Sequence, residues 1–298
     1  MAAGLYASEL QGWMGARLDA AAEDEMLIRV YQEVNKIAHH TLMLTLVLEL
    51  ASLSHAMKLM RKDPRLYASA VWKNLLNHYL IAPAMFAFYV RHQVVPLHVD
   101  ERGALQCDPR KYPFDPLGPP DFSWCNHDRT EMVLQCVGVL LVQAAGYYLA
   151  HMAMHTRKLC WAHRFHHKFS TIVTPVVANA VSWAEYVIAY MLPIFVATVL
   201  LKPSVPALFT AGLLISFFNI MIHTPVIHDW SENLPSWLVS TASHMEHHRV
   251  LSKHFAAPIL NVDFFVAKAL GGSLTEDERR KRFVSQGDPE DLKNKKVE

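Results

Sequence analysis

The sequence predicts an all-α polytopic membrane protein with about five membrane-spanning helices and a histidine-rich helical cap on the cytosolic side. Hydrophobic residues make up 52% of the 298 positions and charged residues only 18%, against ~25% charged in soluble proteins. Several apolar stretches approach the ~20 residues that cross a bilayer. Of the 18 histidines, those between residues 151 and 248 form four clusters near the ends of these stretches.

The charge and the cysteine count exclude several classes of protein. A formal net charge of +1 provides no basic surface for a nucleic-acid backbone. Four cysteines cannot build a disulfide scaffold in a chain of this length. The first residues lack the basic and apolar segments of a cleaved signal peptide. We therefore expect no nucleic-acid partner and no fold that depends on disulfides.

Composition divides the chain into four regions. A polar N-terminal segment (1–36) precedes two apolar stretches and a non-cytosolic loop (37–130). The region that contains the four histidine clusters (131–270) comes next, and we expect it to be the catalytic domain. A charged cytosolic tail (271–298) follows it, and its composition is typical of a solvated segment.

Five apolar stretches are the predicted spans, and they cover residues 38–57, 71–90, 132–150, 183–201 and 205–222. The third and fifth contain no charged residue. The first contains Glu49 and the second contains Lys73, and a charge in mid-bilayer costs ~3 kcal/mol or more. Whether these two stretches both cross is therefore left open, and the alternative for the whole set is buried helices of a soluble protein.

Basic residues in the short loops predict the orientation of the spans. Residues 58–65 and 151–182 are both rich in lysine and arginine, and three residues (202–204) join the last two stretches into a hairpin. The two basic segments and everything after residue 222 are therefore expected on the cytosolic side. Cys107 and Cys125 fall in the loop on the opposite side, and the sequence alone leaves a disulfide between them open.

The four histidine clusters predict a site for two metal ions. On a helix, residues three and four apart share a face, so each cluster directs several imidazoles to one point. Neutral imidazole binds iron, zinc, copper and nickel. Ten histidines are too many for one ion, and two ions with about five nitrogens each account for them. The predicted ligands are His151, His155, His163, His166, His167, His223, His228, His244, His247 and His248.

The other eight histidines are expected to have ordinary roles. His78, inside the second stretch, is expected to be hydrogen-bonded within the helical bundle, and His254 could orient a metal ligand. The remaining six are expected to be interfacial or capping residues, namely His39, His40, His55, His92, His98 and His127.

The order and spacing of the clusters resemble the fatty acid hydroxylase / sterol desaturase superfamily of membrane di-iron oxygenases. The shared pattern is His-x3–4-His, His-x-x-His-His, a histidine pair after a hairpin of spans, and a second His-x-x-His-His, over residues ~130–265. The resemblance implies that all ten histidines bind iron. Where family members have His-Pro-x-Glu at the start of the hairpin, this chain keeps only Glu185. The sequence after the last His-x-x-His-His cluster also differs from the family pattern, so the substrate subclass is left open.

Four further residues are candidates to support the metal ligands. Carboxylates normally fix the tautomers of ligating histidines, and Asp229, Glu246 and Asp263 lie near the clusters in the sequence. Asn219 lies one helical turn before His223 and could hold a metal-bound water. The alternatives are ordinary surface charges for the three carboxylates and bundle packing for the asparagine.

The resemblance implies an O2-dependent lipid oxygenase that hydroxylates, desaturates or epoxidises its substrate. A sterol or sterol precursor is the preferred substrate, and a fatty acyl lipid or sphingolipid is the alternative. The chain has neither a G-x-G-x-x-G nor a His-Pro-Gly-Gly motif, so the electrons are expected from another protein. The resemblance implies that this donor is a separate cytochrome b5 with its NAD(P)H reductase. The alternative from another class is a metal transporter or a scaffold. The ending Lys295-Lys-Val-Glu298 matches a retrieval signal of the endoplasmic reticulum membrane.

Overall fold

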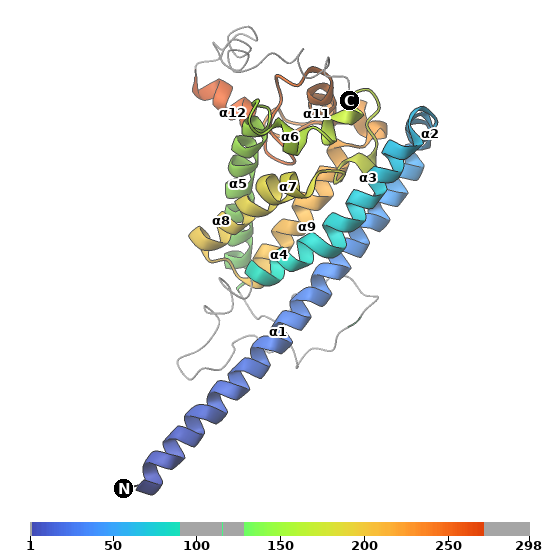
Figure 1. Ribbon diagram of the computed structural model, residues 1–298. Coiled ribbons are helices and arrows are strands. Elements are labelled where there is room, and N and C mark those ends of the chain that lie inside the picture. Colours follow the sequence, from blue (N-terminus) through green and yellow to red (C-terminus); the bar gives the residue numbers. More distant parts are fainter. Residues whose placement is uncertain (1, 90–114, 116–127, 271–298) are drawn as a thin grey trace.

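The computed structural model describes residues 2–89, 115 and 128–270, with side chains from residue 27 onward. Within these ranges the chain is helical and contains no β-strand, which confirms the all-α prediction. Figure 1 shows long helices side by side, with the short helices of a cap gathered at one end and the N-terminal helix α1 (Ala2–Ala51) extending from the other. The histidine clusters lie on these short helices and at the adjoining ends of two of the long helices.

The N-terminal part of the chain folds back on itself. Helix α1 (Ala2–Ala51) meets α2 (Leu53–Lys62) at an angle of 89°. Asp63 then caps the next helix by accepting a hydrogen bond from the Leu66 amide at 2.8 Å. Helix α3 (Pro64–Leu76), the π-helical turn η1 (Asn77–Ile81) and α4 (Ala82–Tyr89) run back beside α1 (Figure 1).

Three further long helices complete the bundle. Helix α5 (Arg129–Met154) packs against both arms of a hairpin. The first arm contains α7 (Trp183–Glu185), η7 (Tyr186–Met191) and α8 (Leu192–Leu201), and the second is α9 (Val205–Ile222). Lys202, in the left-handed region at φ 47°, ends the first arm, and the Ser204 hydroxyl caps the second.

The number of candidate spans is lower than the sequence predicts. Within the described residues, three helices are long and apolar enough to cross a membrane, namely Arg129–Met154, Trp183–Leu201 and Val205–Ile222. A fourth is possible only if the bent pair Leu27–Ala51 and Leu53–Lys62 counts as one span. The structure therefore supports three or four of the about five predicted spans: the stretch 38–57 is bent at Ser52, and the stretch 71–90 contains several polar side chains.

Polar side chains from both of these stretches attach the bundle to the loop that leads out of the cap. The buried Glu49 carboxylate accepts hydrogen bonds from the Val176 amide at 2.9 Å and the Tyr67 hydroxyl at 3.1 Å. The Asn77 side chain donates to the Asn179 carbonyl at 3.0 Å. Their partners belong to η6 (Pro175–Val177) and the residues after it. Glu49 and Asn77, which disfavour a membrane-spanning helix, therefore fix this loop to the bundle.

The cap consists of short helices that follow the ends of the long ones. Helix α6 (Cys160–His163) and η5 (His166–Phe169) come after α5, while η8 (Pro225–Ile227), α10 (His228–Ser231), α11 (Thr241–Val250) and α12 (Val262–Ala269) come after α9. The predicted helical cap is thus confirmed. Cys107, Cys125 and the final Lys295-Lys-Val-Glu298 lie outside the described residues.

Close approach of α5 and α8 depends on a glycine, which predicts a stability effect. A Cβ added at Gly146 would lie 2.7 Å from Pro193 Cβ, so either helix must shift to accept it. We expect Gly146→Ala to lower the free energy of unfolding by ~1–3 kcal/mol, as overpacking does. At Gly138, on the same helix, the added Cβ would meet only the mobile end of Leu201 at 3.0 Å. Thermal unfolding in detergent should therefore show a loss for Gly146→Ala and none for Gly138→Ala; equal effects would contradict this account.

Candidate metal centre

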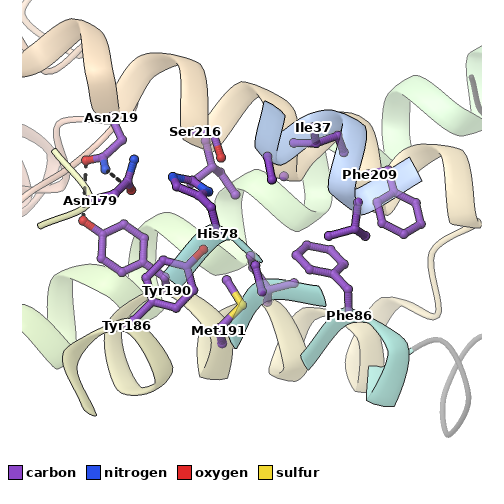
Figure 2. A pocket seen from close by; sticks show the side chains of 16 residues that line it. Ile37, His78, Phe86, Asn179, Tyr186, Tyr190, Met191, Phe209, Ser216 and Asn219 are labelled. Carbon is purple, nitrogen blue, oxygen red and sulfur yellow. Dashed lines mark hydrogen bonds between the residues drawn. The ribbon is translucent and has the colours of Figure 1, made fainter. Parts of the chain in front are cut away.

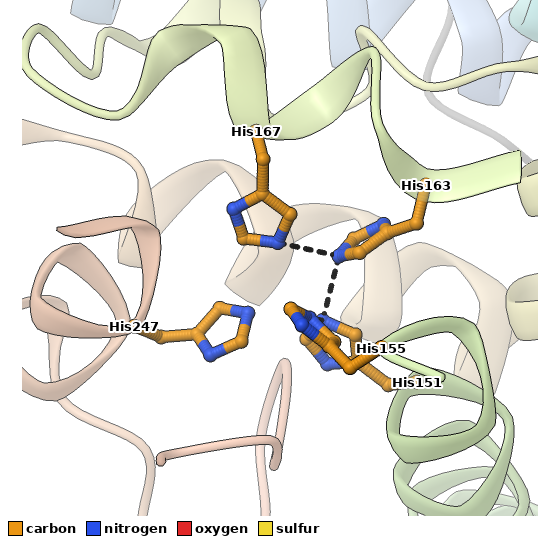
Figure 3. Close-up of side chains that lie close together, drawn as sticks. All are labelled: His151, His155, His163, His167 and His247. Carbon is orange, nitrogen blue, oxygen red and sulfur yellow. Dashed lines mark hydrogen bonds between the residues drawn. The ribbon is translucent and has the colours of Figure 1, made fainter. Parts of the chain in front are cut away.

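Nine of the ten predicted ligands form two groups. In each group, one ring nitrogen of every histidine lies within 4.8 Å of the corresponding atoms of the others, close enough to share a metal ion. The first group consists of His151, His155, His163, His167 and His247. The second consists of His166, His223, His244 and His248. Figure 3 shows the rings of the first group directed toward one point from three separate segments.

Helical spacing divides each His-x-x-His-His box between the two groups. His151 and His155 lie one turn apart at the end of α5 and serve the first group together. On α11, His244 and His248 share a face and reach the second group, while His247 points to the first. The segment that begins with α6 and continues through η5 is divided in the same way. Both boxes therefore contribute to both groups.

Hydrogen bonds at Nδ1 fix which nitrogen faces the centre in two rings of the first group, His151 and His163. His151 Nδ1 donates to the Phe255 carbonyl at 2.8 Å, and His163 Nδ1 donates to Glu185 Oε1 at 2.7 Å. In the neutral ring, Nε2 then carries a lone pair and no proton. These two Nε2 atoms nevertheless lie only 2.9 Å apart. Two lone pairs at this distance repel each other unless a cation lies between them, so the geometry fits a metal ion.

The second group has the same arrangement. His223 Nδ1 donates to the Asn219 carbonyl at 2.7 Å, which leaves a lone pair on Nε2. That Nε2 lies 3.0 Å from His244 Nε2 and 3.4 Å from His248 Nε2. Nitrogens that bind one metal at ~2.0–2.1 Å are themselves roughly 3 Å apart, which matches these separations.

An unpaired nitrogen in the first group supports the same conclusion. His247 Nδ1 donates to the Lys253 carbonyl at 2.8 Å, while its buried Nε2 has no hydrogen-bond partner among the described residues. A buried polar atom without a partner costs free energy, and a metal bond would remove that cost. The donor set is therefore suited to a metal such as iron, for which imidazole is an ordinary ligand.

Burial keeps the cap histidines ready to bind metal. Removal from water lowers the pKa of His163, His167 and His247 well below the ordinary value, and neighbouring imidazoles lower it further. A lower pKa means that these rings are neutral at neutral pH. Protons then do not compete with a metal for the Nε2 lone pairs.

Glu185 is the one carboxylate that orients a grouped histidine through its own side chain within the described residues. It is 1% exposed and reaches His163 from 22 positions away in the chain. The hydroxyl of Ser182 caps the helix turn that carries it by accepting from the Glu185 amide at 3.0 Å. Glu185 is not among the supporting residues predicted from the sequence, although it is the one residue kept from the family's His-Pro-x-Glu pattern, and that is a signal for its role. A carboxylate at Nδ1 makes the Nε2 lone pair a stronger ligand.

We expect Glu185→Gln to weaken metal binding without removing it. Loss of the carboxylate next to a ligating histidine typically costs ~10–100-fold in metal affinity, while the glutamine oxygen can still accept from His163 Nδ1. Chelator titration of the iron-loaded protein measures this affinity. Glu131→Gln, at an exposed carboxylate in the first turn of α5, is the matched control and should have no effect. Equal metal retention in both variants would contradict the role of Glu185.

The four residues that the sequence suggested as supports act less directly. Asp263 Oδ2 accepts from the Ala256 amide at 2.8 Å, next to the carbonyl that holds His151. Glu246 pairs with Lys253 at 2.7 Å, and the Lys253 carbonyl holds His247.

Asn219 and Asp229 do not have the suggested roles. The Asn219 side chain donates to the Ala178 carbonyl and to Asn179, so it packs the bundle while its carbonyl holds His223. Asp229 is fully exposed and contacts only His228 among the interactions of its side chain in the described residues.

The structure does not bring His228 to either group. Its side chain is 40% exposed and its Nδ1 lies 3.1 Å from Asp229 Oδ1. His228 begins α10, immediately after the turn η8, which carries the chain away from the end of α9. The expectation that all ten histidines converge is therefore corrected to nine. His254, which pairs with Glu246 at 3.3 Å, also lies outside both groups.

Residues 136–266 match the family model described as fatty acid hydroxylase. The matched segment begins within α5, ends within α12 and contains both histidine groups. Comparisons with curated proteins and with solved structures returned no match.

Proposed function

We propose that the chain is a di-iron lipid oxygenase, from the premise that residues 136–266 match the fatty acid hydroxylase family, which belongs to the fatty acid hydroxylase/sterol desaturase superfamily. The observation that carries the proposal is the pair of histidine groups whose Nε2 lone pairs face one another at 2.9–3.4 Å. Iron held by neutral imidazoles activates O2 for attack on an unreactive C–H bond.

The residues around the groups prepare the site for this chemistry. Glu185 and the carbonyls of Phe255, Asn219 and Lys253 fix four of the nine rings with Nε2 inward, so these four ligands need little rearrangement. Most of the grouped histidines are fully buried, which keeps bulk water away from the reacting centre. Hydroxylation, desaturation and epoxidation all fit this arrangement.

For the substrate we propose a sterol or sterol precursor, with a fatty acyl lipid or sphingolipid as the second candidate. A separate cytochrome b5, reduced through NAD(P)H, would supply the electrons. A metal transporter is disfavoured, because transport requires ligands near the middle of the spans, whereas both groups lie in the cap and at the adjoining ends of α5 and α9.

We propose that the cap faces the cytosol and that the protein resides in the endoplasmic reticulum membrane. In support, the basic segment 58–65 lies at the cap end of the bundle, where Lys62 Nζ donates to Thr171 Oγ1 at 3.0 Å. Loops rich in lysine and arginine are retained on the cytosolic side. Labelling that places residues 151–182 in the lumen would contradict this orientation.

Lipid profiling tests the proposed activity. Cells that express the chain should accumulate a lipid with one added oxygen atom or one added double bond, and cells without it should accumulate the precursor. A His166→Ala variant, which removes a ligand of the second group, should behave like cells without the chain. Identical profiles for the wild type and this variant would overturn the proposal. A sterol among the changed lipids would support the first candidate, and changed acyl chains the second.

A further inference from the structure

The cavity inside the bundle is too small to hold a lipid. It encloses about 40 Å³, with Asn219 at one end and the stacked rings of Phe86 and Phe209 at the other (Figure 2). His78 lines it, and its Nε2 has no hydrogen-bond partner among the described residues, so the expectation that the bundle satisfies His78 is wrong for this atom. This space has room for a few water molecules. Bilayer lipids therefore contact this part of the bundle at its outer surface.

Helix α2 lies across the cap end of the bundle, at 89° to α1 (Figure 1). One of its faces is buried, because it carries Ala56 and Leu59, and Leu59 belongs to one hydrophobic cluster with Phe169 of the cap. Near the end of the helix, Lys62 Nζ donates to Thr171 Oγ1 at 3.0 Å. These contacts fix α2 to the cap end of the bundle.

A second face of α2 is apolar and exposed. Leu53, Met57 and Met60 are spaced by four and three residues, so they share one face of the helix, which we call the apolar stripe. Leu53 is 52% exposed and Met60 is 41% exposed, and the hydrophobic clusters of the described residues include none of the three. Leu53 and Lys62 lie about two and a half turns apart, hence on opposite sides of the helix. Since Lys62 contacts the cap, the apolar stripe faces away from the cap.

The apolar stripe continues the exposed apolar surface of α1. Leu46 and Leu50, in the last two turns of α1, are 51% and 60% exposed. In a bundle that crosses a bilayer, such side chains contact the acyl chains of lipids. The stripe extends this surface around the bend of 89° and onto a helix that lies across the end of the bundle. A helix in this orientation is placed to lie in the plane of the membrane surface.

The third face of α2 is basic and exposed. Lys58 and Arg61 lie three residues apart on one face, and neither forms an ion pair with a described residue. The segment 58–65 contains four basic residues and one acidic residue, so its charge is positive. On a membrane-surface helix, the apolar face contacts acyl chains while lysine and arginine extend to the headgroups, and a basic cluster on such a helix attracts anionic lipids.

We propose that α2 lies in the headgroup layer of the membrane and binds an anionic phospholipid. The apolar stripe contacts the acyl chains, while Lys58 and Arg61 bind the negatively charged headgroup. A zwitterionic headgroup carries its own cation beside the phosphate, so it gains less from two neighbouring basic side chains. The inference goes beyond the proposed function and does not depend on the metal centre.

Lipid binding to the purified full-length protein in detergent tests the charge selectivity. The probes are phosphatidylserine and phosphatidylcholine with the same acyl chains, and native mass spectrometry of each titration gives the affinity. Phosphatidylserine should bind about tenfold more tightly to the wild type, and Lys58→Gln combined with Arg61→Gln should remove this difference. Arg129→Gln combined with Lys202→Gln, a matched pair of exposed basic residues at the other end of the bundle, should preserve it.

Photocrosslinking of the full-length protein in nanodiscs tests the position of the helix. The nanodiscs contain phosphatidylcholine and phosphatidylserine with a clickable acyl chain. Benzoylphenylalanine in place of Met60, on the apolar stripe, should crosslink to these acyl chains several-fold more than benzoylphenylalanine in place of Lys58, on the basic face.

Several outcomes would overturn the proposal. They are equal affinity of the wild type for the two lipids, equal crosslinking from positions 58 and 60, and crosslinking of position 60 to another protein or to a second copy of the chain instead of lipid. An equal loss of selectivity in the two double variants would also overturn it, because the effect would then not belong to α2. The comparison of lipids on the wild type needs no variant, so it decides the charge selectivity even if a variant fails to fold.

Discussion

Replacing His247 by alanine is expected to abolish lipid oxidation, whereas replacing His228 by alanine should leave the activity within about twofold of the wild type. His247 is fully buried, and its unpaired Nε2 points into the first group, so the substitution removes a metal ligand. His228 is partly exposed and belongs to neither group. Loss of a ligand should lower the activity by more than the ~10–100-fold that is typical when a residue that only supports a ligand is replaced. The rate of product formation in membranes that contain equal amounts of each variant measures the difference.

The two substitutions form a matched pair, since both replace a cap histidine that the sequence predicts as a ligand. Thermal unfolding of each variant distinguishes a lost ligand from a lost fold. An inactive, folded His228→Ala variant would indicate that His228 is a metal ligand and would contradict the nine-histidine arrangement. An active His247→Ala variant would contradict the first group.

The second prediction with a large effect concerns the unequal size of the two groups. The first group has five histidines and the second has four, and they share none. His244→Ala leaves three nitrogens in the second group and should reduce bound iron from about two ions per chain to about one. His155→Ala leaves four nitrogens in the first group, a number that suffices for many metal sites, and should retain more iron.

Elemental analysis after a chelator wash measures both variants against the wild type. Loss of both ions from His244→Ala, or a greater loss from His155→Ala, would show that the two groups do not hold separate ions as the distances indicate. His228→Ala should retain the wild-type content and again provides the control.

The histidine spacing predicted most of the metal centre, because helical periodicity decides which side chains share a face. The spacing alone does not show which face of a helix packs against which other segment of the chain. The division of each box between two groups depends on how α6, η5 and α11 approach one another. His228 was assigned by its spacing from His223, yet the turn after α9 separates the two.

The supporting residues were harder to predict, because proximity in the sequence was a poor guide. Asp229 and Glu246 lie next to histidines in the chain but contact no grouped ring with their side chains in the described residues. Glu185 lies 22 positions from His163, and the spacing of the residues around it does not indicate the contact. The rings of His151, His223 and His247 are held by backbone carbonyls, which every residue possesses and no sequence motif marks.

The first two apolar stretches show a similar limit. Glu49 and Asn77 counted against spanning helices, and their partners, Val176 and Asn179, lie more than a hundred positions away in the chain. A sequence shows that a polar side chain occurs in an apolar stretch, but the partner that satisfies it becomes visible only in the folded chain. The Nε2 atom of His78 has no hydrogen-bond partner among the described residues, so it is the exception among these polar side chains.

The metal content of the wild-type protein tests the central claim most directly. Anaerobic titration of the full-length protein with ferrous iron, followed by gel filtration and elemental analysis, gives the number of ions that each chain retains. Two histidine groups with inward-facing lone pairs predict about two iron ions per chain. Retention of one ion or fewer would contradict the assignment of the two groups as a di-iron centre.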